Sequence, residues 1–161
     1  MSEPHEFLNM LPADEARVAL LRCCGSSRWV AEMLERRPWE SAAALYGDAG
    51  AVWATLGPRD LLEAFAQHPR IGAKGDDAWS RAEQAGAAGA DDATVQALRE
   101  ANDRYFDRFG YIFIVCATGK SAGEMLALLE RRLANDPTRE LAIAAAEQAR
   151  ITRLRLEKLG I

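Results

Sequence analysis

The spacing of helix-stopping residues constrains the fold of this chain more than any other feature. Between the stops, apolar residues recur every three or four positions, which places them on one face of a helix. The stops are Gly25, Pro38, Gly57-Pro58 and His68-Pro69. The Asp136-Pro137 pair instead marks the beginning of the last helix. A one-sided apolar helix needs neighbouring helices to cover it. The pattern therefore predicts an all-α, single-domain bundle of about eight helices spanning residues 1–161.

The stops also set the expected boundaries, with the first predicted helix beginning at Ala13. The predicted helices span residues 13–24, 26–36, 40–56, 60–67, 79–84, 92–109, 121–134 and 137–159. Ser26 or Ser27 is expected to cap the second of these, and Ser121 with Glu124 forms a capping-box pattern.

Residues 111–117, Tyr-Ile-Phe-Ile-Val-Cys-Ala, interrupt this helical texture. The run is apolar and partly β-branched, and its periodicity alone does not distinguish a strand from a buried helix. No second strand candidate is available to pair with it. We therefore expect a buried extended segment that belongs to no sheet.

Composition excludes several classes of protein. The formal net charge is −4, and the basic residues are interleaved with acidic ones, which argues against a nucleic-acid surface. No apolar run approaches the roughly 20 residues that span a bilayer. The N-terminal residues lack the features of a signal peptide, and the C-terminal residues show no organelle address, so we expect a cytoplasmic protein.

The cysteines support the same compartment. Cys23, Cys24 and Cys116 are odd in number, and no pair has CxxC spacing. Two histidines cannot complete a zinc site with them. We expect three mostly buried thiols in a reducing environment and no metal.

His68 is the leading candidate for chemistry. The only other histidine, His5, lies in a polar N-terminal segment, so acid–base work by an imidazole near neutral pH falls to His68. Pro69 disfavours helical geometry at the preceding residue, which predicts a helix-to-loop junction at this imidazole. The alternative is that His68 is an exposed or capping residue without a catalytic role.

Two further groups are candidates for binding. Ser80, Glu83 and Gln84 fall on one face of a helical turn, as a clamp for a small polar ring or, alternatively, as a simple capping box. Arg155 borders the apolar stripe of the last helix, where it either binds a substrate carboxylate or covers the core and pairs with a surface acid. No phosphate loop, nucleophile elbow or metal motif is present, so an enzyme of this sequence is expected to work without metal, nucleotide or covalent cofactor.

Taken together, these motifs resemble the OHCU decarboxylase family, whose substrate is 2-oxo-4-hydroxy-4-carboxy-5-ureidoimidazoline (OHCU). The resemblance covers nearly the whole chain. The matching segments are Asn9-x-Leu11, residues 21–29, Arg37-Pro38, residues 62–72, 79–84, 109–114 and 151–156. The combination of HPxxG with the later SxxEQ is specific, although neither motif is so alone.

The resemblance implies a role for each candidate. His68 is implied to be catalytic, with Glu83 as its partner, and the late-helix arginine falls on Arg155, two positions after Arg153. The implied substrate-binding residues are Pro69, Ser80, Gln84, Arg155 and the backbone of Ile112, Ile114, Val115, Cys116 and Ala117.

The resemblance also implies an all-α fold, a reaction yielding (S)-allantoin in purine catabolism, no cofactor and a homodimer. Two other classes remain open. A ureide hydrolase would need an activating metal or a strong base. A non-enzymatic helical interaction module would not bring the candidate residues together.

Overall fold

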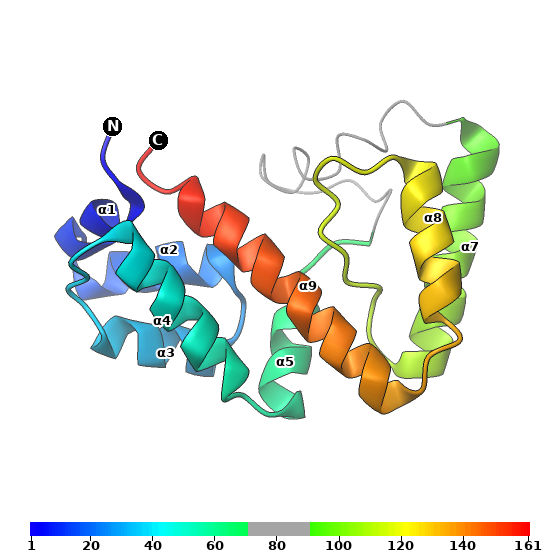
Figure 1. Cartoon of the computed structure of the whole chain (residues 1–161), viewed down its shortest axis with the longest axis horizontal. Helices are drawn as coiled ribbons and strands as arrows, with labels where there is room; N and C mark the ends of the chain where they lie inside the picture. Colours follow the sequence, from blue (N-terminus) through cyan, green and yellow to red (C-terminus); the bar gives the residue numbers. More distant parts are fainter. Residues whose placement is uncertain (71–90) are drawn as a thin grey trace. The chain divides into compact units, whose positions relative to one another are not determined.

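The computed structural model describes residues 1–70 and 91–161. The regular elements among these residues are all helices, and none is a strand (Figure 1). The helices are α1 (Pro4–Met10), α2 (Ala13–Cys23), α3 (Ser27–Glu35), α4 (Ala42–Ala54), α5 (Pro58–Phe65), α7 (Asp92–Phe109), α8 (Ala122–Arg132) and α9 (Pro137–Glu157). The predicted all-α class is confirmed. The helix predicted over residues 79–84 lies outside the described residues.

Side-chain caps explain why the helices begin where they do. Ser26, Ser41, Asp91 and Ser121 each accept a hydrogen bond from the backbone N–H three residues further on. These bonds satisfy amide groups that have no partner within their own helix. The capping box expected at Ser121 is confirmed, because the Glu124 side chain also accepts from the Ser121 amide.

Several boundaries differ from the prediction by one or two residues, and one helix was not expected. Helix α5 begins at Pro58 instead of Asp60, since a proline is well tolerated at the first position of a helix. Helix α1 was not predicted at all. It begins with Pro4, which the Glu3–Glu6 capping box precedes, and it buries Leu8. The polar appearance of the N-terminal residues concealed a short helix with one buried face.

The chain forms two compact units, the first of residues 1–64 and 148–161 and the second of residues 65–147. The first unit contains α1 to α4, most of α5 and the C-terminal part of α9, around a core that includes Leu20, Trp29 and Leu45. The Asn9 amide donates to the Trp39 carbonyl at 2.8 Å and accepts from the Trp39 N–H at 3.0 Å. These two bonds fasten α1 to the loop that follows α3.

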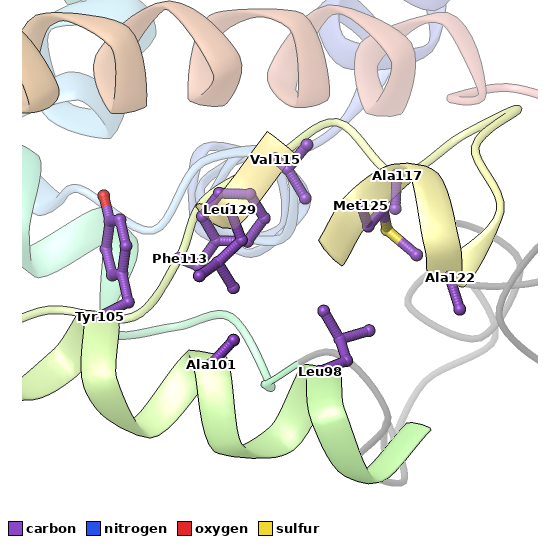
Figure 2. Close-up of a cluster of buried hydrophobic side chains, with 9 residues drawn as sticks. All are labelled: Leu98, Ala101, Tyr105, Phe113, Val115, Ala117, Ala122, Met125 and Leu129. Atoms are coloured by element: carbon purple, nitrogen blue, oxygen red, sulfur yellow. The ribbon is translucent and has the colours of Figure 1, made fainter. Parts of the chain in front are cut away.

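The second unit is built on α7 and α8, which lie side by side, with residues 111–117 returning from the end of one to the start of the other (Figure 1). Figure 2 shows its core, made by three residues from each of these parts. The members are Leu98, Ala101, Tyr105, Phe113, Val115, Ala117, Ala122, Met125 and Leu129.

Every second residue of the 111–117 segment enters this core. Phe113, Val115 and Ala117 belong to the cluster, whereas the intervening Ile114 and Cys116 do not, although both are buried. A period of two is the signature of extended backbone. The prediction of a buried extended segment outside any sheet is therefore confirmed for the described residues.

None of the helices within residues 1–70 and 91–161 combines the length and the apolar character needed to cross a membrane.

The core of the second unit yields a stability prediction. Leu129 is fully buried, so Leu129→Ala removes its contacts and leaves a cavity, which lowers the free energy of unfolding by about 2–5 kcal/mol. Urea denaturation followed by circular dichroism measures this loss. Val18→Ala, at a side chain that is 59% exposed, is the control and should change the free energy by less than about 0.5 kcal/mol. Equal midpoints for the two variants would contradict the assignment of this core.

Candidate functional site

His68 lies just beyond the end of α5. The helix ends at Phe65, and the His68 N–H donates to the Phe65 carbonyl at 3.2 Å in the turn that follows. The His68 and Pro69 side chains are half-buried. The helix-to-loop junction expected from Pro69 is therefore present, with the imidazole neither fully exposed nor sealed in the core.

Contacts on both sides of the His68-Pro69 step fix it within the second unit. Before the step, the Phe65 ring packs on Tyr111, with ring centroids 5.3 Å apart. After it, the Arg70 guanidinium pairs with Asp103 and lies 5.2 Å from the centre of the Phe106 ring, both on α7. The junction is thus tied to α7 and to the start of the 111–117 segment.

The backbone of the 111–117 segment is hydrogen-bonded by side chains. The Ile114 carbonyl accepts from Arg132 Nη1 at 2.7 Å, and the Cys116 carbonyl accepts from Lys120 Nζ at 2.7 Å. The Cys116 N–H donates to Glu147 Oε1 at 3.1 Å. Buried peptide groups need such partners, and here charged side chains replace the neighbouring strand of a sheet.

Arg132 belongs to a buried polar network. Its Nε and Nη2 atoms donate to Glu140 Oε2 at 2.9 and 2.6 Å. Glu140 also accepts from the Tyr105 hydroxyl and, at 3.1 Å, from the Asn135 amide. Arg132 is 7% exposed and Glu140 is 0% exposed. Burial, and then the bond to Glu140, raises the pKa of Tyr105 far above its ordinary value, so its hydroxyl stays a donor.

Arg155 lies in the first unit and is half-buried. Its Nη1 donates to the Arg22 carbonyl at 3.0 Å, in the last turn of α2. A cation at this place complements the negative end of the helix dipole. Arg155 also lies near the buried Cys24. Burial raises the pKa of the Cys24 thiol to about 11, and the charge of Arg155 partly opposes that rise.

Arg153, two residues earlier, has different surroundings. Its Nε donates to Glu157 at 2.8 Å, and its guanidinium lies 3.8 Å from the centre of the Tyr46 ring. It borders a cavity of about 200 Å³ in the first unit, whose walls include Trp29 and Trp53. Arg153 is exposed and pairs with the surface acid Glu157.

The structure brings some of the predicted site residues into one unit. His68, Pro69 and the backbone of residues 112–117 all belong to the second unit. Arg155 belongs to the first unit, and Ser80, Glu83 and Gln84 lie outside the described residues. Within residues 1–70 and 91–161, no three His, Cys, Asp or Glu side chains gather as metal ligands. The three cysteines are buried and free, as predicted.

The sequence reasoning missed Arg132, Glu140 and Glu147, which bind the segment or support its partners. Their helical spacing carried a signal. Arg132 follows the buried Leu129 by three positions, and Glu140 precedes the buried Ala144 by four. A charged residue in register with an apolar stripe faces the interior, where it needs a partner.

This chain is similar to proteins named for the degradation of uric acid. Residues 9–157 match the family model of OHCU decarboxylase. The chain is 41% identical to the uric acid degradation bifunctional protein TTL of Arabidopsis thaliana over 145 residues. This aligned region covers 85% of this chain and 45% of that protein. It is 27% identical to the 2-oxo-4-hydroxy-4-carboxy-5-ureidoimidazoline decarboxylase of Halalkalicoccus jeotgali, covering 84% of this chain and 79% of that protein.

A solved structure agrees with these sequence relatives. A crystal structure of OHCU decarboxylase in the presence of (S)-allantoin matches this chain with a TM-score of 0.79 and 38% identity, covering 86% of this chain and 94% of that one. By contrast, this chain spans less than half the length of the bifunctional Arabidopsis protein.

The raised pKa of Cys24 makes its reactivity depend on pH. Because the folded-state pKa is about 11 against an ordinary 9.0, about one thiol in a thousand is ionised at pH 8. Alkylation of native Cys24 by iodoacetamide should therefore be slow at pH 8 and accelerate about tenfold per pH unit toward pH 11. Peptide mass mapping measures the rate at each pH.

The same shift has a consequence for stability. A raised thiol pKa means that ionisation opposes folding, so this contribution to stability is full below pH 9 and declines as the pH rises through about 11.

The control for the alkylation experiment is the urea-unfolded chain, in which Cys24 is exposed and should be alkylated rapidly at pH 8. Equally rapid labelling of the native protein at that pH would contradict the burial of this thiol.

Proposed function

The chain belongs to the OHCU decarboxylase family, and from this premise we propose that it decarboxylates OHCU to (S)-allantoin, the last step of urate oxidation to allantoin. The observation that carries the proposal is the family match over residues 9–157, which includes His68 at its helix-to-loop junction. The attachment of that junction to the start of the 111–117 segment supports a common site for the two.

The substrate can supply its own electron sink. One ring carbon carries both the hydroxyl and the carboxylate, and it neighbours a ring C=N bond. When the bond between this ring carbon and the carboxylate breaks, CO₂ leaves and the electron pair forms a double bond between the two neighbouring ring carbons. The nitrogen of the former C=N bond takes up a proton. The resulting enol then loses its hydroxyl proton to become a carbonyl, while the neighbouring carbon gains a proton from one face and becomes the chiral centre of allantoin.

This chemistry requires the protein to orient the substrate and to stabilise the charge that moves during the reaction. It needs no cofactor as electron sink. We assign His68 to accept or polarise the proton of the substrate hydroxyl, with Glu83 as its partner. Arg155 and the backbone amides of residues 112–117 hold the carboxylate, the ring carbonyl or the ureido group. Pro69 lines the same pocket, and Ser80 and Gln84 hydrogen-bond the polar ring.

We further propose a cytoplasmic homodimer without nucleic-acid partners. The acidic net charge of −4 supports the last point, and the family resemblance supports the dimer. Light scattering coupled to size-exclusion chromatography measures the mass, against 17.7 kDa for one chain.

The central prediction concerns His68. Fresh OHCU decays spontaneously to racemic allantoin, so enzymatic product is recognised by its optical activity. Freshly generated substrate should give optically active allantoin with the wild-type protein. His68→Ala should lower kcat by about 10²–10⁴-fold through loss of the acid–base group. Circular dichroism of the product follows both reactions.

The matched control is His5→Ala, which removes the other histidine of the chain and should leave the rate within a factor of two. Purely racemic product with the wild-type protein would overturn the proposed function. A hydrolase would instead consume a ureide with no release of CO₂, and a binding module would leave the spontaneous rate unchanged.

A second prediction separates the two late-helix arginines. Arg155→Lys keeps the charge but loses the planar fork that binds a carboxylate through two bonds, so kcat/KM should fall about 10–100-fold. Arg153→Lys, at the exposed arginine paired with Glu157, is the control and should change kcat/KM by less than a factor of three. Steady-state kinetics with both variants decides, and the reverse pattern would move the substrate role to Arg153.

A further inference from the structure

The hydrogen bonds of the 111–117 segment have a directional consequence. A peptide group is planar and trans, so its C=O and the N–H of the next residue point in opposite directions. Arg132 holds the Ile114 carbonyl, and that carbonyl shares a peptide group with the Val115 N–H. The Val115 N–H therefore points away from Arg132. By the same reasoning Lys120, which binds the Cys116 carbonyl, directs the Ala117 N–H.

Within the part of the chain that the structure describes, neither the Val115 nor the Ala117 N–H has a hydrogen-bond acceptor, although both residues are buried. Buried amides without a partner are rare in folded proteins, and such a group calls for a specific explanation. Residues two apart in extended backbone direct their N–H groups to the same side, so these two donors face one side of the segment, where they suit an oxygen that carries negative charge.

The Arg132 guanidinium contacts three partners, one of which is the peptide group between Ile114 and Val115. Its Nη1 reaches the Ile114 carbonyl while Nε and Nη2 bind Glu140, and its guanidinium lies 4.4 Å from the centre of the Phe113 ring. The planar fork thus contacts the backbone, a carboxylate and an aromatic face at once. A lysine ammonium carries the same charge at a single point and cannot span these three partners.

Glu140 in turn fixes Arg132. The carboxylate is fully buried and accepts from the Tyr105 hydroxyl and the Asn135 amide, in addition to the guanidinium. An ion pair so placed has little freedom to shift, because each partner would lose its compensation in a nonpolar interior. The orientation of the peptide group at Ile114 is therefore set by a chain of contacts that extends from α9 to α8.

We propose that Arg132 is a positioning residue of the decarboxylation, which aims the Val115 N–H at the substrate by holding the carbonyl of the same peptide group. This inference rests on the proposed function. Arg132 itself touches no reacting atom; it acts through the backbone. The amide that it aims donates to an oxygen of OHCU, the carboxylate or the ring carbonyl, on which charge changes during loss of CO₂.

The test is Arg132→Lys, measured by steady-state kinetics on freshly generated OHCU and by the optical purity of the allantoin formed. Misdirecting one donor weakens binding of the transition state more than binding of the substrate. We expect kcat to fall about 10–100-fold with KM within a factor of three. Arg131→Lys, at the exposed arginine next in sequence, is the matched control and should leave kcat within a factor of two.

A further variant separates positioning from stability. Leu45→Ala removes a fully buried side chain of the first unit and touches none of the Arg132 contacts, so it should lower the melting temperature and leave kcat within a factor of three. If Arg132→Lys does not fold, Glu140→Gln takes its place, because it keeps the side-chain shape and removes the charge that fixes Arg132. We expect that variant to lower kcat about 3–10-fold.

The outcomes distinguish the two proposals. Racemic product from the wild-type protein would overturn the proposed function itself. An active wild type with a folded Arg132→Lys of equal kcat would overturn only the positioning role. A fall in kcat of Leu45→Ala as large as that of Arg132→Lys would also overturn it, since the loss of stability alone would then account for both.

Discussion

The second unit depends on how one buried piece of extended backbone is satisfied without a sheet. Residues 113, 115 and 117 enter the core of α7 and α8, and residues 113–117 are all buried. Its peptide groups then need partners. Arg132, Lys120 and Glu147 provide partners for three of its polar groups, from α8, from the turn before it and from α9. Three charged side chains from different elements thus replace one neighbouring strand, and they fix the direction of each peptide group that they bind.

Burying these charges carries a cost that hydrophobic packing would avoid. A buried ion pair such as Arg132 with Glu140 adds little net stability over apolar residues of similar volume, because both groups lose their hydration. What the pair supplies is a defined geometry, since a planar guanidinium with three partners has one arrangement that satisfies them all. The decarboxylation that we propose depends on oriented donors and would make use of that property.

The sequence predicted the helical fold well because its signals are local. A proline after His68, a serine at residue 121 and alternating apolar residues each act within a few positions, and the corresponding ends lie at or close to the expected residues. The network was missed for the opposite reason. Arg132, Ile114 and Glu140 are brought together only by the packing of α8 and α9 around the segment. The interleaved charges indicated surface residues. Arg132, however, follows Leu129 by three positions, and this spacing places it on the inner face of the helix. Helix α1 escaped similarly, because one buried leucine in seven residues gives almost no periodicity.

The attachment of His68 follows the same physical logic as that of the segment. Its backbone N–H donates locally, to the carbonyl of Phe65 at the end of α5. Phe65 on Tyr111 and Arg70 on Asp103 and Phe106 hold the turn from both sides. Tyr111 is also the residue from which the segment departs. Phe65 thus links the histidine junction to Tyr111, where the segment begins, and Arg132 holds the Ile114 carbonyl further along the same segment.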